Sequence, residues 1–375
     1  MKKVIVILSI LLIIAAIYAI RVGSIRQGEN QKKLVLLAQE DKEKSKIEGA
    51  RFSTLNAYQK IFEEQDINAL IIGDEIGESI GSSDSDKKWF NIIKKDFSEK
   101  YKSTITMDLI TGSSTTVIRG WVALNNAKQT KKYDLAFICL GQNDQRDIKP
   151  EQFIKFYESI IIKLKKMNPS MDIIPIIESS FKDYNKYLDA IKALSKHYNL
   201  QYADTIEAFK ASGEKHSELS KDGIRPNDKG YSYYATTVEN IIHSNYTSNK
   251  KTDTKYSVLN ASTNKLTNFV YDNSPDLNSG YSFDNGITGD KIGNTLTFNT
   301  TNSVAIIQFL KQPNGGRFKV FVDDKLVKEI NTNLTYQVSY SNLIFDNLEG
   351  PHKIEIIVSA IDKDQTVKIL GLATN

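Results

Sequence analysis

The stretch that decides the fold reads Asn68-Ala69-Leu70-Ile71-Ile72-Gly73-Asp74-Glu75-Ile76-Gly77-Glu78-Ser79. Its apolar run stops abruptly at Gly-Asp-Glu, and two more glycines follow before a helix-like segment begins at Lys87. This pattern predicts a short buried strand that ends in a tight turn. Open α/β sheets bind their ligands at the carboxyl ends of such strands, and the side chain presented there would be that of Glu75.

Strand-like and helix-like segments alternate through residues 61–246. The predicted strands are 68–72, 104–110, 134–140, 172–177 and 200–203, and the predicted helices are 87–101, 115–127, 150–167, 183–198 and 228–244. Strands that alternate with helices imply βαβ units, and therefore a parallel sheet with helices on both faces.

Two later segments match the first one in character. Phe137-Ile138-Cys139-Leu140-Gly141-Gln142-Asn143-Asp144 is an apolar run that ends in polar residues, and Asp222-Gly223-Ile224-Arg225 is a turn-rich loop ahead of the last predicted helix. In order and spacing, the three segments resemble the blocks of the SGNH (GDSL-type) hydrolase family, which read Gly-Asp-Ser, Gly-x-Asn-Asp and Asp-x-x-His. The resemblance covers about residues 66–246 and implies a flavodoxin-like, three-layer αβα fold.

The resemblance also assigns roles to single residues. In this family a serine attacks an ester carbonyl, a histidine accepts its proton and an aspartate orients the histidine. Carried over by position, Glu75 stands at the nucleophile, Arg225 at the base and Asp222 at the orienting acid. The family's catalytic serine and histidine are therefore both replaced in this chain.

The resemblance places an oxyanion site as well, where N–H groups stabilise the negative oxygen of the transition state. Asn143 falls at the side-chain donor of this site. The second donor is the backbone N–H of a central glycine, and alignment on the threonines puts Ser114 or Ser113 there, with Gly112 one or two residues away.

Neither replacement is compatible with the serine mechanism. A carboxylate that attacked an ester would form a high-energy mixed anhydride, and arginine stays protonated at any usable pH. Loss of both groups should remove most of the roughly 10⁶-fold rate contribution measured in comparable triads. We predict instead an ion pair between Glu75 and Arg225, with Asp222 near the same guanidinium. The alternative is that the two are independent, solvated charges.

Other candidate groups give weaker signals. Ser79 follows Glu75 by one helical turn but has no histidine placed to serve it, and Asp74 is expected to brace the turn. A glycosidase pair of Glu75 and Asp222 is disfavoured because Arg225 between them would keep both ionised. The four histidines lack metal-ligand spacing, so no metal or cofactor is predicted; they are His197, His216, His243 and His352.

The N-terminus predicts a membrane segment. Lys2 and Lys3 precede an apolar run from Val4 to Ile20, which is at the short end of what spans a bilayer. Ile17 stands where a signal-peptidase site ending at Ala19 would need a small residue, so an uncleaved anchor in residues 1–21 is favoured over a cleaved signal. Polar residues 22–60 then form a stalk, and the domains lie outside the cytoplasm, membrane-bound or alternatively secreted.

The C-terminal third has a different pattern. A polar linker is predicted at 247–257, and residues 258–375 contain short strand-like runs separated by Asn, Gly and Asp turns. This organisation predicts an all-β sandwich, loosely similar to the jelly-roll modules that accompany carbohydrate-active enzymes. Its aromatic residues could form a sugar platform, although most aromatics in a sandwich belong to its core; they are Tyr271, Tyr281, Phe283, Tyr336 and Tyr340.

Composition excludes some functions. The 375 residues carry a formal net charge of only +4 with no basic block, which gives no support to nucleic-acid binding. The single cysteine, Cys139, cannot form an internal disulfide.

The sequence therefore favours a membrane-anchored, catalytically impaired SGNH-like protein whose partner is acylated cell-envelope polysaccharide or another protein. Two alternatives stay open. One is an active carbohydrate esterase, deacetylase or O-acetyltransferase with a rearranged site, and the other is a purely structural envelope protein with an adhesive β domain.

Overall fold

The computed structural model describes residues 54–375 except 129–130, 267 and 284–285, together with positions 12–14, 18, 21–24, 27, 31–39, 42–43, 46, 49 and 51–52. The described positions of the N-terminal part are helical, and this part forms a unit separate from the compact unit Asn56–Asn375. Among the described residues, no helix has both the length and the apolar character needed to cross a bilayer. Most of the predicted anchor, residues 1–21, lies outside the described residues.

The first domain of the compact unit is built on a parallel five-stranded sheet in the order β2-β1-β3-β4-β5, as the resemblance implied. Its strands are β1 (Ile67–Gly73), β2 (Ile105–Thr111), β3 (Leu135–Cys139), β4 (Asp172–Ile177) and β5 (Ala203–Asp204). Its α-helices are α2 (Ala57–Phe62), α3 (Trp89–Tyr101), α4 (Val117–Asn126), α5 (Asp144–Asp147), α6 (Pro150–Met167), α7 (Lys186–His197), α8 (Thr205–Ala211), α9 (His216–Leu219) and α10 (Asp228–Thr247). Short 3₁₀ turns are η1 (Ser85–Lys87) and η2 (Ser179–Phe181).

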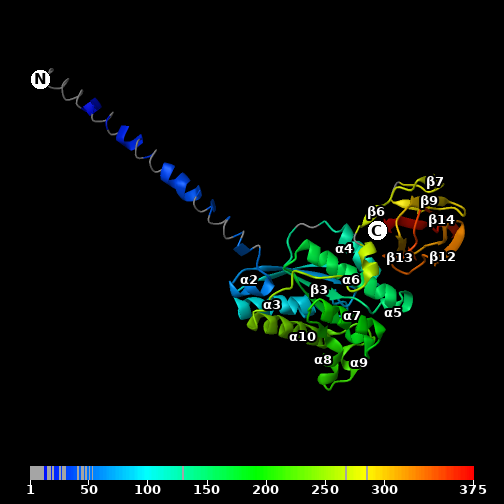
Figure 1. Ribbon diagram of the computed structural model, residues 1–375, viewed down its shortest axis with the longest axis horizontal. Coiled ribbons are helices and arrows are strands. Elements are labelled where there is room, and N and C mark those ends of the chain that lie inside the picture. Colours follow the sequence, from blue (N-terminus) through cyan, green and yellow to red (C-terminus); the bar gives the residue numbers. More distant parts are fainter. Residues whose placement is uncertain are drawn as a thin grey trace. The chain divides into compact units, whose positions relative to one another are not determined.

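Each face of this sheet has its own apolar core, because successive side chains of a strand point to opposite faces. On β1, Leu70 and Ile72 pack with residues of α4, α6 and α7, whereas Ala69 and Ile71 pack with residues of α2, α3 and α10. Figure 1 shows α4 and α6 on one side of the sheet and α3 and α10 on the other. The central strands are buried on both faces, which explains why they read as continuous apolar runs.

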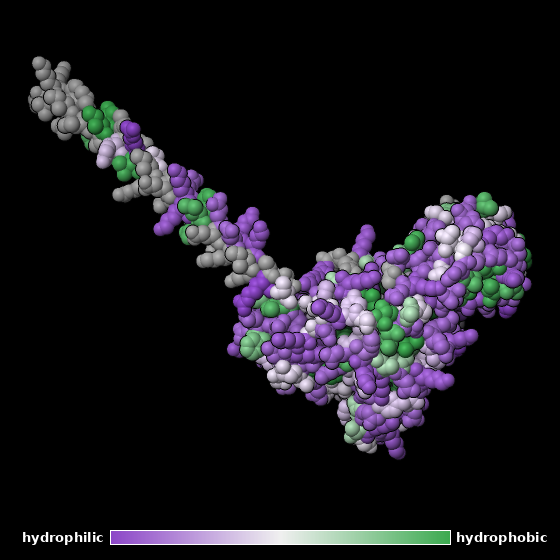
Figure 2. Space-filling view, viewed as in Figure 1, coloured by the Kyte–Doolittle hydropathy of each residue, from purple (hydrophilic) through white to green (hydrophobic). Residues whose placement is uncertain are grey.

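The C-terminal domain is a sandwich of two antiparallel sheets, as predicted. One sheet has the order β13-β10-β15-β6, with β8 also paired to β15, and the other has the order β12-β11-β14-β9-β7. The elements are η3 (Ala261–Leu266), β6 (Val270–Asp272), β7 (Leu277–Ser279), β8 (Ile287–Gly289), β9 (Thr295–Thr300), β10 (Val304–Lys311), β11 (Arg317–Val322), β12 (Lys325–Asn331), β13 (Val338–Asp346), β14 (His352–Ala360) and β15 (Val367–Thr374). The face of the molecule drawn in Figure 2 is mostly hydrophilic, with small apolar patches.

The two domains share contacts through α6. Val304, Ile306 and Leu343 of the sandwich belong to the same apolar cluster as the α6 side of the parallel sheet. At the end of this helix nearer the sandwich, Lys155 forms an ion pair with Asp346. The sandwich is therefore packed onto the first domain rather than held at the end of a free linker.

A buried carboxylate reinforces this contact. Glu158 of α6 accepts hydrogen bonds from the Tyr198 hydroxyl (2.6 Å) and from the Leu259 and Asn260 backbone N–H groups (2.5 and 3.0 Å). It also accepts a bond from the Thr263 hydroxyl at 2.8 Å. Four donors satisfy a fully buried carboxylate and fix the start of the second domain.

One boundary differs from that expected. The compact unit begins at Asn56, within the predicted stalk, because Tyr58 and Ile61 of α2 fill the core on the α3 and α10 side. At the other end, α10 ends at Thr247, and the segment without regular structure begins within one residue of the predicted start of the linker.

Candidate active site

The turn after β1 is tight and is braced from within. The Asp74 carboxylate accepts hydrogen bonds from the backbone N–H groups of Ile76 (2.8 Å) and Gly77 (3.4 Å). A Cβ on Gly73 would lie only 3.1 Å from both the Cys139 carbonyl oxygen and the Gly77 Cα, so the turn is closely packed against β3. This packing presents the next side chain, Glu75, at the carboxyl edge of the sheet.

The Glu75 carboxylate fills the position that the family resemblance assigns to the oxyanion. Its Oε2 atom accepts a hydrogen bond from the Ser114 backbone N–H at 2.9 Å and another from the Asn143 side-chain amide at 3.0 Å. Glu75 is only 6% exposed. The structure thus brings together three of the predicted site residues, and both predicted oxyanion donors point at the glutamate.

The backbone decides which residue of the second block supplies the donor. Ser114 has a φ of +57°, a left-handed conformation that favours glycine. It therefore stands where the resemblance implies the family's central glycine, and its N–H is the donor that meets Glu75. Ser113 contributes a carbonyl oxygen instead, which accepts a bond from Arg119 at 2.6 Å.

Asn143 is positioned by the residue that follows it. The buried Asp144 carboxylate accepts the Val117 N–H at 2.9 and 3.2 Å, which ties the start of α4 to the start of α5. This link brings the Ser114 loop and Asn143 to the same point. The Asn143 amide also donates to Asp74 at 3.0 Å, so it joins both acids of the turn.

A second layer of acid groups lies beneath the turn. Asp74, Glu178 and Cys139 are buried, with potential ligand atoms within 4.8 Å of one another. Desolvation, and repulsion from Glu178 and Glu75, raise the pKa of Asp74 well above its ordinary value. Desolvation also raises the pKa of Glu178 to about 7, even though hydrogen bonds from Gln142, Asp74 and Cys139 act to lower it.

These groups are engaged with the protein itself. Glu178 accepts bonds from the Gln142 N–H at 2.9 Å and from the Cys139 thiol at 3.3 Å. Protonated Asp74 can donate to Glu178, which leaves the pair with one shared proton. We assign this cluster to support of the turn rather than to metal binding, since its oxygen atoms already have partners.

Arg119 is a site residue that the sequence analysis missed. Its guanidinium is within electrostatic reach of Glu75 and of Tyr340 in the β domain, and burial lowers its pKa against these two influences. Arg119 lies in the first turn of α4, where the helix dipole disfavours a cation. A basic residue at that position was the signal that could have identified it.

The predicted ion pair between Glu75 and Arg225 is wrong. Arg225 pairs instead with Asp222, at 3.2 Å between Nη1 and Oδ2, and both side chains are 44% exposed. Glu75 takes its donors from Ser114 and Asn143 on the sheet side, so it has no need of a guanidinium from the loop. Burial would raise the pKa of Asp222, but the backbone N–H groups of Arg225 and Ile224 and the guanidinium lower it overall.

The Asp222–Arg225 loop nevertheless lies beside the first block. A Cβ on Gly81 would come within 2.5 Å of the Pro226 carbonyl oxygen, and the Tyr231 hydroxyl donates to the Ile80 carbonyl at 2.8 Å. Ser83 adds two bonds to Asp228. The loops that carry Glu75 and Arg225 are thus in contact, but the two side chains bind different partners.

No histidine of the chain has a serine hydroxyl as its hydrogen-bond partner in the described residues. His216 faces the Ser179 carbonyl (3.3 Å), His197 the Ser257 carbonyl (2.7 Å), His243 the Tyr101 hydroxyl and His352 an aspartate. Ser79 is buried, and its hydroxyl accepts the Trp89 N–H at 3.3 Å. Ser79 therefore has a structural part at the start of α3.

Comparisons with known proteins agree with this fold. Residues 71–233 match the GDSL-like lipase/acylhydrolase family. A crystal structure of a two-domain esterase active on acetylated mannans superposes with a TM-score of 0.72 at 15% identity, over 84% of this chain and 93% of that one. The structure of a two-domain esterase of the same description, co-crystallised with mannopentaose, gives 0.71 at 16% identity, over 84% and 92%. No curated protein matches.

Proposed function

Because the α/β domain of this chain belongs to the SGNH/GDSL hydrolase family, we propose that the protein is a member that has lost serine-type ester hydrolysis and binds acylated envelope polysaccharide. The observation that carries this proposal is the Glu75 carboxylate on the two oxyanion donors, Ser114 N–H and Asn143.

That arrangement opposes ester hydrolysis in two ways. The donors that would stabilise a developing oxyanion are already bonded to a carboxylate oxygen, so a substrate would have to displace it. The same carboxylate would repel the negative charge that forms on the substrate. A water molecule activated by Glu75 would face the same obstacle, because the charge it creates has no free donor.

The Asp222–Arg225 side of the site also opposes ester hydrolysis. Arg225 cannot accept a proton, and its pairing with Asp222 leaves that acid without an imidazole to orient. The site thus keeps the family's frame and donors without groups that could attack an acyl carbon or move its proton.

The polysaccharide ligand is proposed from the two-domain relative. That two-domain esterase is active on acetylated mannans, and the likeness spans both domains of this chain. Since that likeness is at 15% identity, it supports the shared fold, and the ligand class is our inference. We also propose that the apolar N-terminal run keeps the protein at the outer face of the membrane, where such polymers occur.

The test restores the missing groups. The double variant Glu75→Ser with Arg225→His should hydrolyse p-nitrophenyl acetate about 10²-fold faster than Glu75→Ala, the contribution expected of a positioned general base. Glu75→Ser alone is the matched control and should stay near the Glu75→Ala rate. The unmodified protein should not exceed Glu75→Ala on this ester or on acetylated mannan. Turnover above that control would show a working esterase or transferase with a rearranged site.

A further inference from the structure

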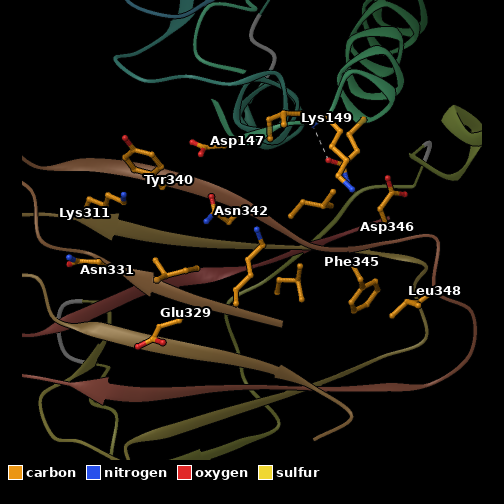
Figure 3. Close-up of a pocket in the computed structure, with 16 residues that line it drawn as sticks. Asp147, Lys149, Lys311, Glu329, Asn331, Tyr340, Asn342, Phe345, Asp346 and Leu348 are labelled. Atoms are coloured by element: carbon orange, nitrogen blue, oxygen red, sulfur yellow. Dashed lines mark hydrogen bonds between the residues drawn. The ribbon is translucent and has the colours of Figure 1, made fainter. Parts of the chain in front are cut away.

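A large cleft lies where the β sandwich meets the first domain. Its volume is about 680 Å³, and it is lined by residues 147–149 and Gln152 around the start of α6 and by residues of β10, β12 and β13. Figure 3 shows Tyr340, Lys311 and Asn342 of the sandwich facing Asp147 and Lys149 across this space. We call it the interdomain cleft.

The charges of the interdomain cleft are unbalanced. Among its acids, Asp147 is paired with Arg146 at 3.0 Å and Asp346 with Lys155, so their charges are already compensated. Its three lysines have no carboxylate within 4.0 Å in the described part of the chain; they are Lys149, Lys311 and Lys328. Only one acid of the lining, Glu329, lacks a cationic partner among the described residues. The cleft therefore presents an excess of positive charge.

Tyr340, one of the aromatic residues predicted to form a sugar platform, lines the interdomain cleft. Its ring is not a free stacking surface. Tyr340 stacks on Phe309, with ring centroids 6.0 Å apart and planes inclined by 22°. The Lys311 ammonium lies 4.5 Å from the centroid of the same ring. A neutral sugar would have to displace that ammonium before it could stack on Tyr340, whereas an anionic group could bind to it directly.

Polar donors complete the cleft. The side-chain amide of Asn342 has no hydrogen-bond partner within the residues that the structure describes, and it projects into the space in Figure 3. The start of α6 adds the positive end of a long helix dipole beside Lys149. An amide that can bond hydroxyls and lysines that can bond anions together suit a sugar that carries a negative charge.

We propose that the interdomain cleft binds an anionic segment of a polysaccharide, with the carboxylate or phosphate groups of the polymer held by Lys149, Lys311 and Lys328. This inference rests on the proposed function and narrows its ligand from acylated polysaccharide in general to a polymer with charged groups.

Binding of the full chain to three polymers tests the proposal. The polymers are polygalacturonate, which carries carboxylates, poly(glycerol phosphate), which carries phosphates, and neutral mannan. We expect one of the two anionic polymers to bind more tightly than mannan, and which one it is identifies the anion. The triple variant Lys149→Gln, Lys311→Gln, Lys328→Gln should weaken this binding about tenfold, as expected for the loss of three modest charge interactions.

A matched variant separates this cleft from general surface charge. Lys196→Gln, Lys251→Gln, Lys363→Gln removes the same charge from exposed positions outside the cleft and should change affinity less than about twofold. Glu329→Gln, which removes the unpaired acid, should tighten binding. Equal losses in both triple variants, a preference for mannan, or no binding to either anionic polymer would overturn the proposal.

The outcomes also separate this inference from the proposed function. Ester turnover by the unmodified chain would refute the proposed function, yet the comparison of the two lysine variants would still test the interdomain cleft. Binding of acetylated mannan that does not depend on the three lysines would refute the proposal for the cleft and leave the proposed function standing. Thermal unfolding of each variant checks that a loss of binding does not reflect a loss of fold.

Discussion

Glu75 and Arg225 occupy the two positions where the family resemblance implies the nucleophile and the base, and the chain holds them in different ways. Glu75 is buried and is bonded to groups that come from two other segments, the Ser114 loop and the start of α5. Arg225 is half exposed, and the partner of its side chain is three residues away in the same loop.

The difference shows how firmly each of the two positions is tied to the rest of the fold. The oxyanion side is part of the sheet edge, since Asp144 ties α4 to α5 and Asn143 joins both acids of the turn. Its geometry is therefore held by contacts between several segments of the domain. On the base side, Arg225 lies in a local loop, and its guanidinium pairs with the carboxylate of Asp222 in that same loop.

The largest effect that would sharpen this comparison concerns Asn143 in the restored variant. On the Glu75→Ser, Arg225→His background, Asn143→Ala should lower kcat by about 10²-fold, to near the Glu75→Ala rate, as the loss of one oxyanion donor does. Steady-state kinetics on p-nitrophenyl acetate measure this change. A loss below about threefold would mean that the two donors are not an oxyanion site once Glu75 is removed.

A smaller effect is expected on stability. In the unmodified chain, Asn143→Ala leaves Asp74 and Glu75 without a shared donor and should lower the free energy of unfolding by about 1–3 kcal/mol. Arg225→Ala is the matched change on the base side, and it should cost no more than about 0.5 kcal/mol because the pair is exposed. Urea denaturation of both variants compares them, and equal costs would remove the distinction between the two sides.

A further effect is a pH dependence of stability that arises on the oxyanion side. The pKa of Glu178 is about 7 in the folded protein and 4.5 as its ordinary value, so the folded state retains the proton longer than the unfolded state. The contribution of Glu178 to the free energy of unfolding is then greatest below its ordinary pKa and declines as the pH rises toward 7, by at most about 1.4 kcal/mol per pH unit for one proton. The raised pKa of Asp74 acts in the same direction.

Glu178→Gln isolates this contribution. The variant should lose much of the decline in unfolding free energy between about pH 5 and 7, the window set by the shifted and the ordinary pKa. Urea denaturation of both proteins at several pH values measures it. Parallel curves for the two proteins would show that Glu178 does not hold the proton.

Several of these features could be predicted from the sequence because they are local. The strands and turns at Glu75 and Asn143 follow from apolar runs that end in glycine and polar residues, and parallel strands bring such ends to one edge. The choice of Ser114 over Ser113 could not be made, since it depends on a left-handed backbone at Ser114 that spacing does not reveal.

The remaining features depend on contacts between distant segments. Arg225 was expected to meet Glu75, but a closer carboxylate and a more complete set of donors for Glu75 decided otherwise. The interdomain cleft and the role of Arg119 require the position of the sandwich, and this is set by residues about a hundred positions apart in the chain, such as Glu158 and Asn260. No periodicity encodes such pairings.

The carboxylate of Glu158 has a consequence for how the chain can be divided. Three of its four donors come from the segment after α10, at Leu259, Asn260 and Thr263. In a protein truncated at the end of α10, Glu158 would keep only one of its four donors, the Tyr198 hydroxyl, at a position that is closed to solvent in the complete chain. During synthesis, the first domain must therefore wait for the start of the second to emerge before its own interior is complete.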